Sequence, residues 1–385
     1  MPTAATTAGG TREGTDKRGA QRQAMPTVPF VRASAEHREP TGIDVSRQIT
    51  TADQDLGVFD IPAYGYVRSI VLLVQATGGA GGSAVTSEDG PWNALKNIAF
   101  TEPNGAVIDQ YNSGYEAFVA NKWGGYRSPQ GSDFRASPTF SAIAAASGNF
   151  TFMVRIPIEL NLRDGLGSLP NQNAAATFKL RLTLAASTTI YATPPATTLP
   201  TVRVRAFLEA WDQPETQTAG QVNQVTPPAM NTTQFWSPQV YTVNAGQNTI
   251  RLTRVGNYIR NLILIARRGG TSRANGDADF ADPLTLYLDT RPLDTIERNN
   301  WKHQMYERTG FGRNAIAAEA ASGLDNGVFV YDFCHEFDGE IGRELRDLWL
   351  PTLGSSRLEI QGSFAQAGTL TVLTNDVSVA GSVFL

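Results

Sequence analysis

Alternation of apolar and polar residues is the main signal along the chain after Val58. Between Asn149 and Leu160 every second residue is apolar, with Glu159 on the polar side, and Thr177–Leu184 repeats the pattern. The apolar positions of these two segments are Phe150, Phe152, Val154, Ile156, Ile158, Leu160, Phe178, Leu180, Leu182 and Leu184. A period of two places one face of a strand in a core and the other in water, which is typical of antiparallel sheets. The pattern predicts an all-β fold.

A hairpin turn and two helices interrupt the strands. Pro103-Asn104-Gly105 predicts the turn, because Asn-Gly adopts positive φ at little cost. Ser113–Trp123 is predicted to be helical, since Ser113 with Glu116 makes a capping box. Asp294–Thr309 is predicted to be the second helix, with Asp294 and Glu297 at its start.

The two halves of the chain repeat each other in order. Tyr66–Leu73 resembles Tyr258–Ile265, Val107–Asp109 resembles Tyr287–Asp289, Leu162–Asp164 with Leu169-Pro170 resembles Leu345–Asp347 with Leu350-Pro351, and Phe178–Leu184 resembles Arg357–Phe364. A capped helix follows the second match in each half. Such a repeat is too long for a solenoid and indicates two copies of one β-domain. A jelly roll of two four-stranded sheets fits a domain of this size.

These patterns divide the chain into four parts. Residues 1–54 contain one aromatic residue, Phe30, and are expected to form a flexible, extended N-terminal arm. Residues 55–211 and 235–385 are the predicted jelly rolls, each eight-stranded with a short helix. Residues 212–234 are polar and without periodicity, so we expect a linker.

Composition narrows the function. The net charge of −4 argues against a chain that binds polyanions as a whole. The single cysteine, Cys334, is expected to exclude an intramolecular disulfide and any cysteine-based zinc site. Three histidines leave little for a histidine-rich metal centre. We expect neither a signal peptide nor a membrane-spanning helix, because no apolar run is long enough.

Local motifs give no strong sign of catalysis. Gly78–Gly82 lacks the Lys-Ser/Thr of a phosphate-binding loop, and Asn275–Asp279 lacks the terminal Glu of a calcium loop. Cys334-His335-Glu336 is expected to hold a buried cysteine and a surface histidine, because adjacent strand residues point to opposite faces. His303 and Glu307 are expected to form a surface pair on a helix.

We therefore predict no catalytic, cofactor-binding or metal-binding residues and no cofactor. A carboxylate pair for glycoside hydrolysis is not marked by its surroundings. Asn149 and Asn231 fit glycosylation motifs, and we assign neither. Phe235-Trp236 follows the predicted linker, and we expect it to anchor the second roll against the first.

Several segments resemble those of a known family. They are Gly57–Asp60, Gly90–Leu95, Phe152–Leu160 with Leu166 and Leu169-Pro170, and Gly327–Asp332. In order and pattern they resemble the double-jelly-roll major capsid proteins of tailless icosahedral viruses, most closely those of tectivirus-like bacteriophages with an internal membrane. The resemblance covers residues 56–385.

The resemblance implies a virion protein, made in the host cytoplasm, that trimerises and then packs trimer against trimer in an icosahedral shell. It further implies contacts with other capsid proteins, such as a vertex protein, and an inner arm near the viral membrane, without specific nucleic-acid binding. Gly78–Gly90 and Arg267–Asp282 would be tower or inter-subunit loops. Two alternatives stay open: a tandem jelly-roll carbohydrate-binding or spike protein, and a tandem jelly-roll hydrolase.

Overall fold

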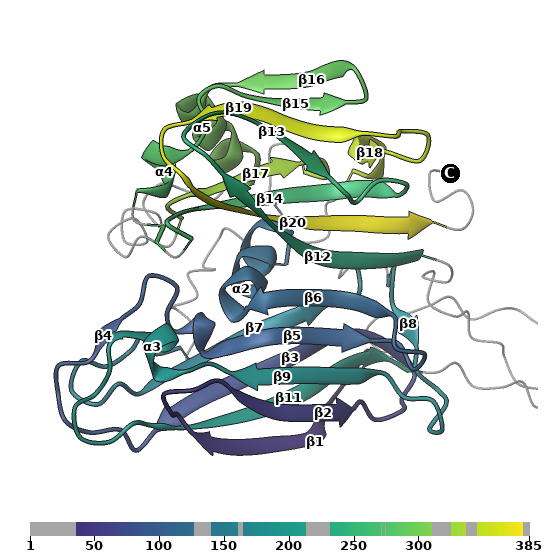
Figure 1. The fold of residues 1–385 in the computed structure, drawn as a ribbon. Helices are drawn as coiled ribbons and strands as arrows, with labels where there is room; N and C mark the ends of the chain where they lie inside the picture. The colour runs from purple at the N-terminus through teal and green to yellow at the C-terminus, as the bar shows by residue number, and fades with distance from the viewer. Residues whose placement is uncertain are drawn as a thin grey trace, which may run out of the picture. The chain divides into compact units, whose positions relative to one another are not determined.

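The computed structural model describes residues 36–126, 140–160, 165–212, 232–270, 272–273, 275–309, 325–335 and 345–379. All of them belong to one compact unit. Its strands form two rolls in succession along the chain (Figure 1).

The first roll runs from β1 to β11. Its eight main strands are β1 (Glu36–Gln48), β2 (Gln54–Asp60), β3 (Tyr66–Thr77), β5 (Leu95–Thr101), β6 (Val107–Ser113), β7 (Phe150–Pro157), β9 (Lys179–Leu184) and β11 (Thr201–Trp211). Its short elements are β4 (Val85–Thr86), η1 (Trp92–Ala94), α2 (Gly114–Trp123), β8 (Leu169–Pro170), α3 (Ser187–Ile190) and β10 (Tyr191–Thr193).

The second roll runs from β12 to β20. Its eight main strands are β12 (Thr232–Val243), β13 (Gly246–Leu252), β14 (Tyr258–Arg268), β15 (Leu284–Leu288), β16 (Arg291–Ile296), β17 (Val328–Asp332), β19 (Leu358–Phe364) and β20 (Gly368–Val379). Its short elements are α4 (Gly276–Asp279), α5 (Arg298–Thr309), η3 (Arg346–Leu348) and β18 (Leu350–Pro351).

The two rolls have the same strand topology. One sheet of the first roll has the order β1-β11-β3-β7, with β8 beside β3, and the second roll has β12-β20-β14-β17, with β18 beside β14. The opposing sheets are β2-β9-β5-β6 and β13-β19-β15-β16. Helix α2 follows β6, and helix α5 follows β16, which is the counterpart of β6 in the second roll. The predicted duplication and the double jelly roll are therefore confirmed.

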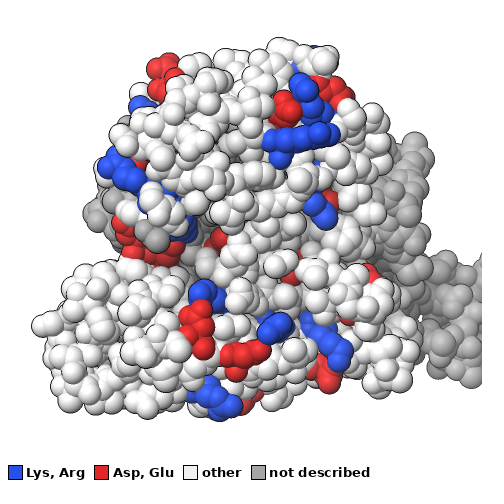
Figure 2. Space-filling model, in the orientation of Figure 1, with Lys and Arg blue, Asp and Glu red and all other residues white. Residues whose placement is uncertain are grey.

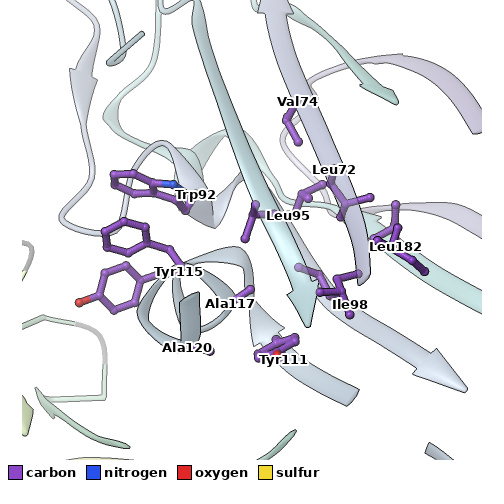
Figure 3. Close-up of a cluster of buried hydrophobic side chains, with 14 of the residues drawn as sticks. Leu72, Val74, Trp92, Leu95, Ile98, Tyr111, Tyr115, Ala117, Ala120 and Leu182 are labelled. Atoms are coloured by element: carbon purple, nitrogen blue, oxygen red, sulfur yellow. The ribbon is translucent and has the colours of Figure 1, made fainter. Parts of the chain in front are cut away.

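The cores follow the alternation in the sequence. In β7 and β9 the predicted inward side chains are buried, while Lys179 and Arg181 face out. Helix α2 closes the first roll, and its Tyr115 and Ala117 lie beside Trp92 and Leu95 (Figure 3). The hairpin at Gly105 also forms as predicted, with the Gly105 N–H donating to the Glu102 carbonyl over 2.9 Å.

Most of the matched repeats are structurally equivalent. Tyr66 and Tyr258 begin β3 and β14, and Leu169-Pro170 and Leu350-Pro351 are β8 and β18. The match of Val107–Asp109 to Tyr287–Asp289 was wrong, because Val107 begins β6 whereas Tyr287 lies in β15, the counterpart of β5. Short strands share too few residue types for a three-residue match to fix the register.

Three sequence expectations need correction. The arm was predicted to extend to residue 54, yet Glu36–Gln48 is β1 and pairs with β11, because backbone pairing and burial of Ile43 supply what composition alone lacks. Asp294 is not the start of a helix but pairs with Leu286 in the β15–β16 hairpin. Glu159 was placed on the polar face but is buried and ion-paired to Arg68.

Candidate assembly surfaces

The two rolls join through a continuous sheet. β12 of the second roll runs parallel to β6 of the first, with Trp236 opposite Asp109, so the two sheets form one nine-stranded sheet (Figure 1). Trp236 is buried in the core of the first roll, with its ring centre 6.3 Å from that of Tyr111. This confirms Trp236 as an anchor between the rolls. Burial raises the pKa of Asp109 well above its ordinary value.

Helix α2 fills the space between the rolls. The outward face of the β14, β17 and β20 strands contributes to the same core as α2. These outward residues are Ile263, Ile265, Val328, Val330 and Leu373. Because this sheet has a core on both faces, eight consecutive residues of β14, 259–266, are buried, unlike those of a strand with one wet face.

Two loops tie the rolls together by charge. Arg267, near the end of β14, and Arg273, which follows β14, lie 2.7 and 2.6 Å from the carboxylate of Asp89 in the first roll. Burial tends to raise the pKa of Asp89, but the two guanidinium groups outweigh it and hold that pKa below its ordinary value. The Ser272 hydroxyl donates to Glu88 over 2.8 Å. The loops expected from the family resemblance to form towers thus contact each other within the chain.

A hollow of about 650 Å³ opens between these loops and α2. It is lined by charged groups from both rolls, among them Lys96, Glu116 and Arg267. Burial raises the pKa of Glu116 to about 7. Its Oε2 accepts the Asn112 N–H over 2.7 Å, at the start of α2. The hollow therefore contains a carboxyl group that titrates near neutral pH.

A buried arginine occupies the same β-bulge in both rolls. Arg68 in β3 donates to Glu159 and Glu36 over 2.5 and 2.6 Å and stacks on Trp211. The strand registers make Arg260 in β14 its counterpart.

The environment of Arg260 differs from that of Arg68. Arg260 donates to Asn375 Oδ1 over 2.6 Å. Beside it, Gln234 bonds to Tyr126 of the first roll. The first site is carboxylate-rich, whereas Asn375 and Gln234 bring neutral amides to the second, which lies at the junction.

The same registers identify residues of the first roll whose counterparts in the second roll are buried between the two rolls, but which are themselves exposed or only partly buried. Phe207 is opposite Val71 and corresponds to Leu373, which is fully buried between the rolls. Arg38 is opposite Glu209 and corresponds to Trp236. The Arg38 side chain is 65% exposed, and that of Phe207 is partly exposed. β1 and β16 each lie at the edge of their sheet.

Charged side chains on the face shown in Figure 2 form small groups of mixed sign.

The structure accounts for most of the other sequence candidates. In the glycine-rich loop, Ala80 bridges to Thr198. Within Asn275–Asp279, Asp277 accepts the Gly327 N–H and Asp279 pairs with Arg268, so both carboxylates are engaged. His303 and Glu307 form the expected exposed pair on α5, 3.8 Å apart.

The two glycosylation motifs differ in what the structure describes. The side chain of Asn149 accepts the Gly79 N–H over 3.0 Å. Asn231 lies outside the described residues. Neither observation assigns a modification.

The expectation for Cys334 and His335 was half wrong. Cys334 is buried as predicted, but His335 is also buried, and its Nδ1 lies 3.2 Å from Cys334 Sγ. β17 ends at Asp332, so the alternation of a strand does not apply to the two residues. Asp332 Oδ2 lies 2.8 Å from the same Nδ1. Glu336 lies outside the described residues.

Within the described residues, no helix is long and apolar enough to cross a membrane. No protein-family model matches the chain, and neither does any curated protein.

Solved viral structures do match the fold. The major capsid protein of bacteriophage PM2 is 10% identical with a TM-score of 0.51, covering 90% of this chain and 99% of that one. A chain from Sulfolobus Turreted Icosahedral Virus is 11% identical with a TM-score of 0.58, covering 90% and 91%. A chain of the PBCV-1 virus capsid is 11% identical with a TM-score of 0.56, covering 89% and 93%. At these identities the likeness establishes a shared double-jelly-roll fold.

Proposed function

We propose that this chain is a major capsid protein, which trimerises into pseudo-hexameric blocks that tile an icosahedral shell. Its work is assembly rather than catalysis. The fold supports this, because the matched chains from PM2 and PBCV-1 are capsid proteins. Two rolls of equal topology also give a trimer six similar domains, which suits a lattice of near-hexagonal units.

The proposal rests mainly on a difference in burial between equivalent sheet faces of the two rolls. In the second roll, Leu373 and Ile263 on the outer sheet face are covered by α2 of the first roll. In the first roll, their counterparts Phe207 and Val71 are only partly buried. We assign this face to a second copy of the chain, whose α5 and β16 would repeat the contact made by α2 and β6.

The inter-chain contact is expected to be more polar than the junction within the chain. Arg38 stands where the junction has Trp236, and Arg155 and Arg205 lie near Phe207 on the first roll. Helix α5 in turn exposes His303 and Glu307. Such a contact weakens as salt rises, because exposed ion pairs are screened.

Light scattering coupled to size exclusion tests the proposal. The wild-type chain should elute as a trimer, and electron micrographs should show blocks with near-sixfold outlines. Phe207→Glu should give a folded monomer, because it places a charge in the proposed contact. Val58→Glu, on the exposed side of β2, is the matched control and should remain trimeric.

The outcomes separate the alternatives. A trimeric Phe207→Glu variant would move the contact elsewhere while leaving assembly intact. A monomeric wild-type chain that binds glycans would favour the carbohydrate-binding alternative. Turnover abolished by one Asp or Glu substitution would favour the hydrolase alternative.

We also propose that residues 1–35 face the inside of the shell and contact the viral membrane. Arg12, Lys17, Arg18 and Arg22 form a basic cluster there that would attract anionic headgroups. The full chain should co-sediment with anionic phospholipid vesicles, and a chain starting at Met25 should not. Equal sedimentation of both would refute the contact. Contacts with a vertex protein stay part of the same proposal.

A further inference from the structure

Three potential metal ligands converge just after β17. Asp332 Oδ2 lies 2.8 Å from His335 Nδ1, and Cys334 Sγ lies 3.2 Å from that same nitrogen. Sγ is also 3.1 Å from Asp332 Oδ1. All three side chains are buried, and one ligand atom from each lies within 4.8 Å of the others.

The geometry does not suit a nucleophile activated by a histidine. In a proton relay the nucleophile and the carboxylate bond to opposite ring nitrogens. Here Sγ and Oδ2 both face Nδ1, so His335 cannot pass a proton from one to the other. Three different donor atoms that lie within 4.8 Å of one another can instead ligate one metal ion.

The side chain of Asn261 provides an independent observation. Asn261 is fully buried in β14, and its Oδ1 lies 3.8 Å from Cys334 Sγ. Among the described residues its Nδ2 has no hydrogen-bond partner. A cation does not satisfy this donor, so the support for a metal comes from Oδ1, whose distance of 3.8 Å from Sγ is close to the spacing of two ligands on one tetrahedral ion.

We propose that Asp332, Cys334 and His335 bind a zinc ion through Oδ2, the thiolate and Nδ1, with Asn261 Oδ1 placed near the fourth position. The proposal departs from the expectation that a single cysteine excludes a cysteine-based zinc site, because histidine and aspartate can supply the other ligands of a tetrahedral zinc ion. Bonds of about 2.3 Å to sulfur and 2.0 Å to nitrogen hold such ligands about 3.5 Å apart. The Sγ–Nδ1 distance therefore needs only a small shift.

Contacts around the three residues support a structural ion. Asp332 Oδ1 accepts the N–H groups of Cys334 and His335, which fixes the carboxylate. The metal would replace the contact between Oδ2 and His335 Nδ1, with both atoms deprotonated. Cys334 packs with Leu160 and Leu166 of the first roll. The ion would thus stiffen the segment after β17 where it meets the other roll. The metal site does not depend on the capsid proposal.

Cobalt binding tests the site directly. Because Cys334 is the only cysteine, a thiolate-to-cobalt charge-transfer band can arise only from this site. The full-length protein, titrated with Co²⁺ alone, should develop that band together with the visible bands of tetrahedral cobalt. After equilibration with Zn²⁺ and dialysis, it should retain one zinc per chain and release protons on binding, since the thiol must ionise.

Two variants complete the experiment. Cys334→Ser keeps the shape of the side chain and should lose both the charge-transfer band and the retained zinc. Asp60→Asn, on the exposed strand β2 at the opposite end of the nine-stranded sheet from β17, is the control and should match the wild type. Equal zinc content in wild type and Cys334→Ser, or a wild-type cobalt spectrum without the thiolate band, would overturn the proposal, and neither result depends on assembly.

Discussion

Helices α2 and α5 hold the same place in the two rolls but have opposite surroundings. All ten residues of α2 are buried, whereas α5 buries Trp301, Met305 and Thr309 among its twelve. The difference arises because α2 lies beneath the second roll, while much of α5 faces outward. The duplication preserved the framework, and the residues diverged according to whether another roll covers them.

The two bulged arginines teach the same lesson. Around Arg68 the partners are the carboxylates Glu36 and Glu159, and the Glu36 side chain is still 25% exposed. At the junction, Gln234 takes the position of Glu36 and is fully covered. A covered carboxylate is more costly to desolvate than a covered amide. The replacement of the glutamate at position 36 by a glutamine at the equivalent position 234 is therefore consistent with the burial of the second site.

Truncating Trp236 should cause the largest loss of stability among the substitutions that compare the two rolls. Trp236→Ala removes a buried ring from the contact between the rolls, and it should lower the free energy of unfolding by about 3–5 kcal/mol. Arg38→Ala, at the equivalent position of β1, should cost about 0–1 kcal/mol in the monomer, because its ion pairs are exposed. Urea denaturation of both variants measures the difference.

The Trp236→Ala and Arg38→Ala variants also distinguish an effect on folding stability from an effect on trimer formation. If Arg38 faces a second copy, Arg38→Ala should weaken the trimer while its monomer unfolds like the wild type. Equal destabilisation by the two substitutions would show that the two positions are not differently covered, and the comparison between the rolls would fail.

The pH dependence of stability should reveal the buried carboxyl group of Glu116 near the start of α2. Burial raises the pKa of Glu116 to about 7, from an ordinary value of 4.5. Between these values the folded chain keeps a proton that the unfolded chain has lost, so stability falls as pH rises. At about 1.4 kcal/mol per pKa unit, the loss reaches at most about 3 kcal/mol. Glu116→Gln should remove this part of the slope.

Thermal melts at pH 5 and pH 8 measure the effect. Glu116→Gln keeps an acceptor for the Asn112 N–H, so it should match the wild type at pH 5 and exceed it at pH 8. Glu307→Gln on α5 controls for the loss of a surface carboxylate. A wild-type protein as stable at pH 8 as at pH 5 would rule out the raised pKa.

The fold was predictable from the sequence because its signals are local and repeated. Alternation placed Phe152 and Leu180 in the core, and the recurrence of Tyr66–Leu73 at Tyr258–Ile265 revealed the duplication. Trp236 was identified as an anchor because it follows a polar stretch. Each inference needed only the period of a strand or the order of segments.

The junction and the cysteine cluster were not predictable, because they depend on which surfaces meet. Nothing near Asp89 in the sequence indicates Arg267, which lies far along the chain in the other roll. β1 was missed because its pairing with β11 is distant in sequence. His335 was misplaced because β17 ends at Asp332, a boundary set by the surrounding packing rather than by local pattern.

The starts of the two helices give the smallest test of the comparison. Ser113 caps α2 by accepting the Glu116 N–H over 3.4 Å, a long hydrogen bond. Ser113→Ala should therefore cost about 0.5–1 kcal/mol, at the low end for a lost cap. Glu297→Ala, at the exposed residue before α5, should change stability by no more than about 0.5 kcal/mol. Chemical denaturation resolves this difference, and a larger loss from Glu297→Ala would mean that the α5 start, despite its exposure, contributes more than its covered counterpart.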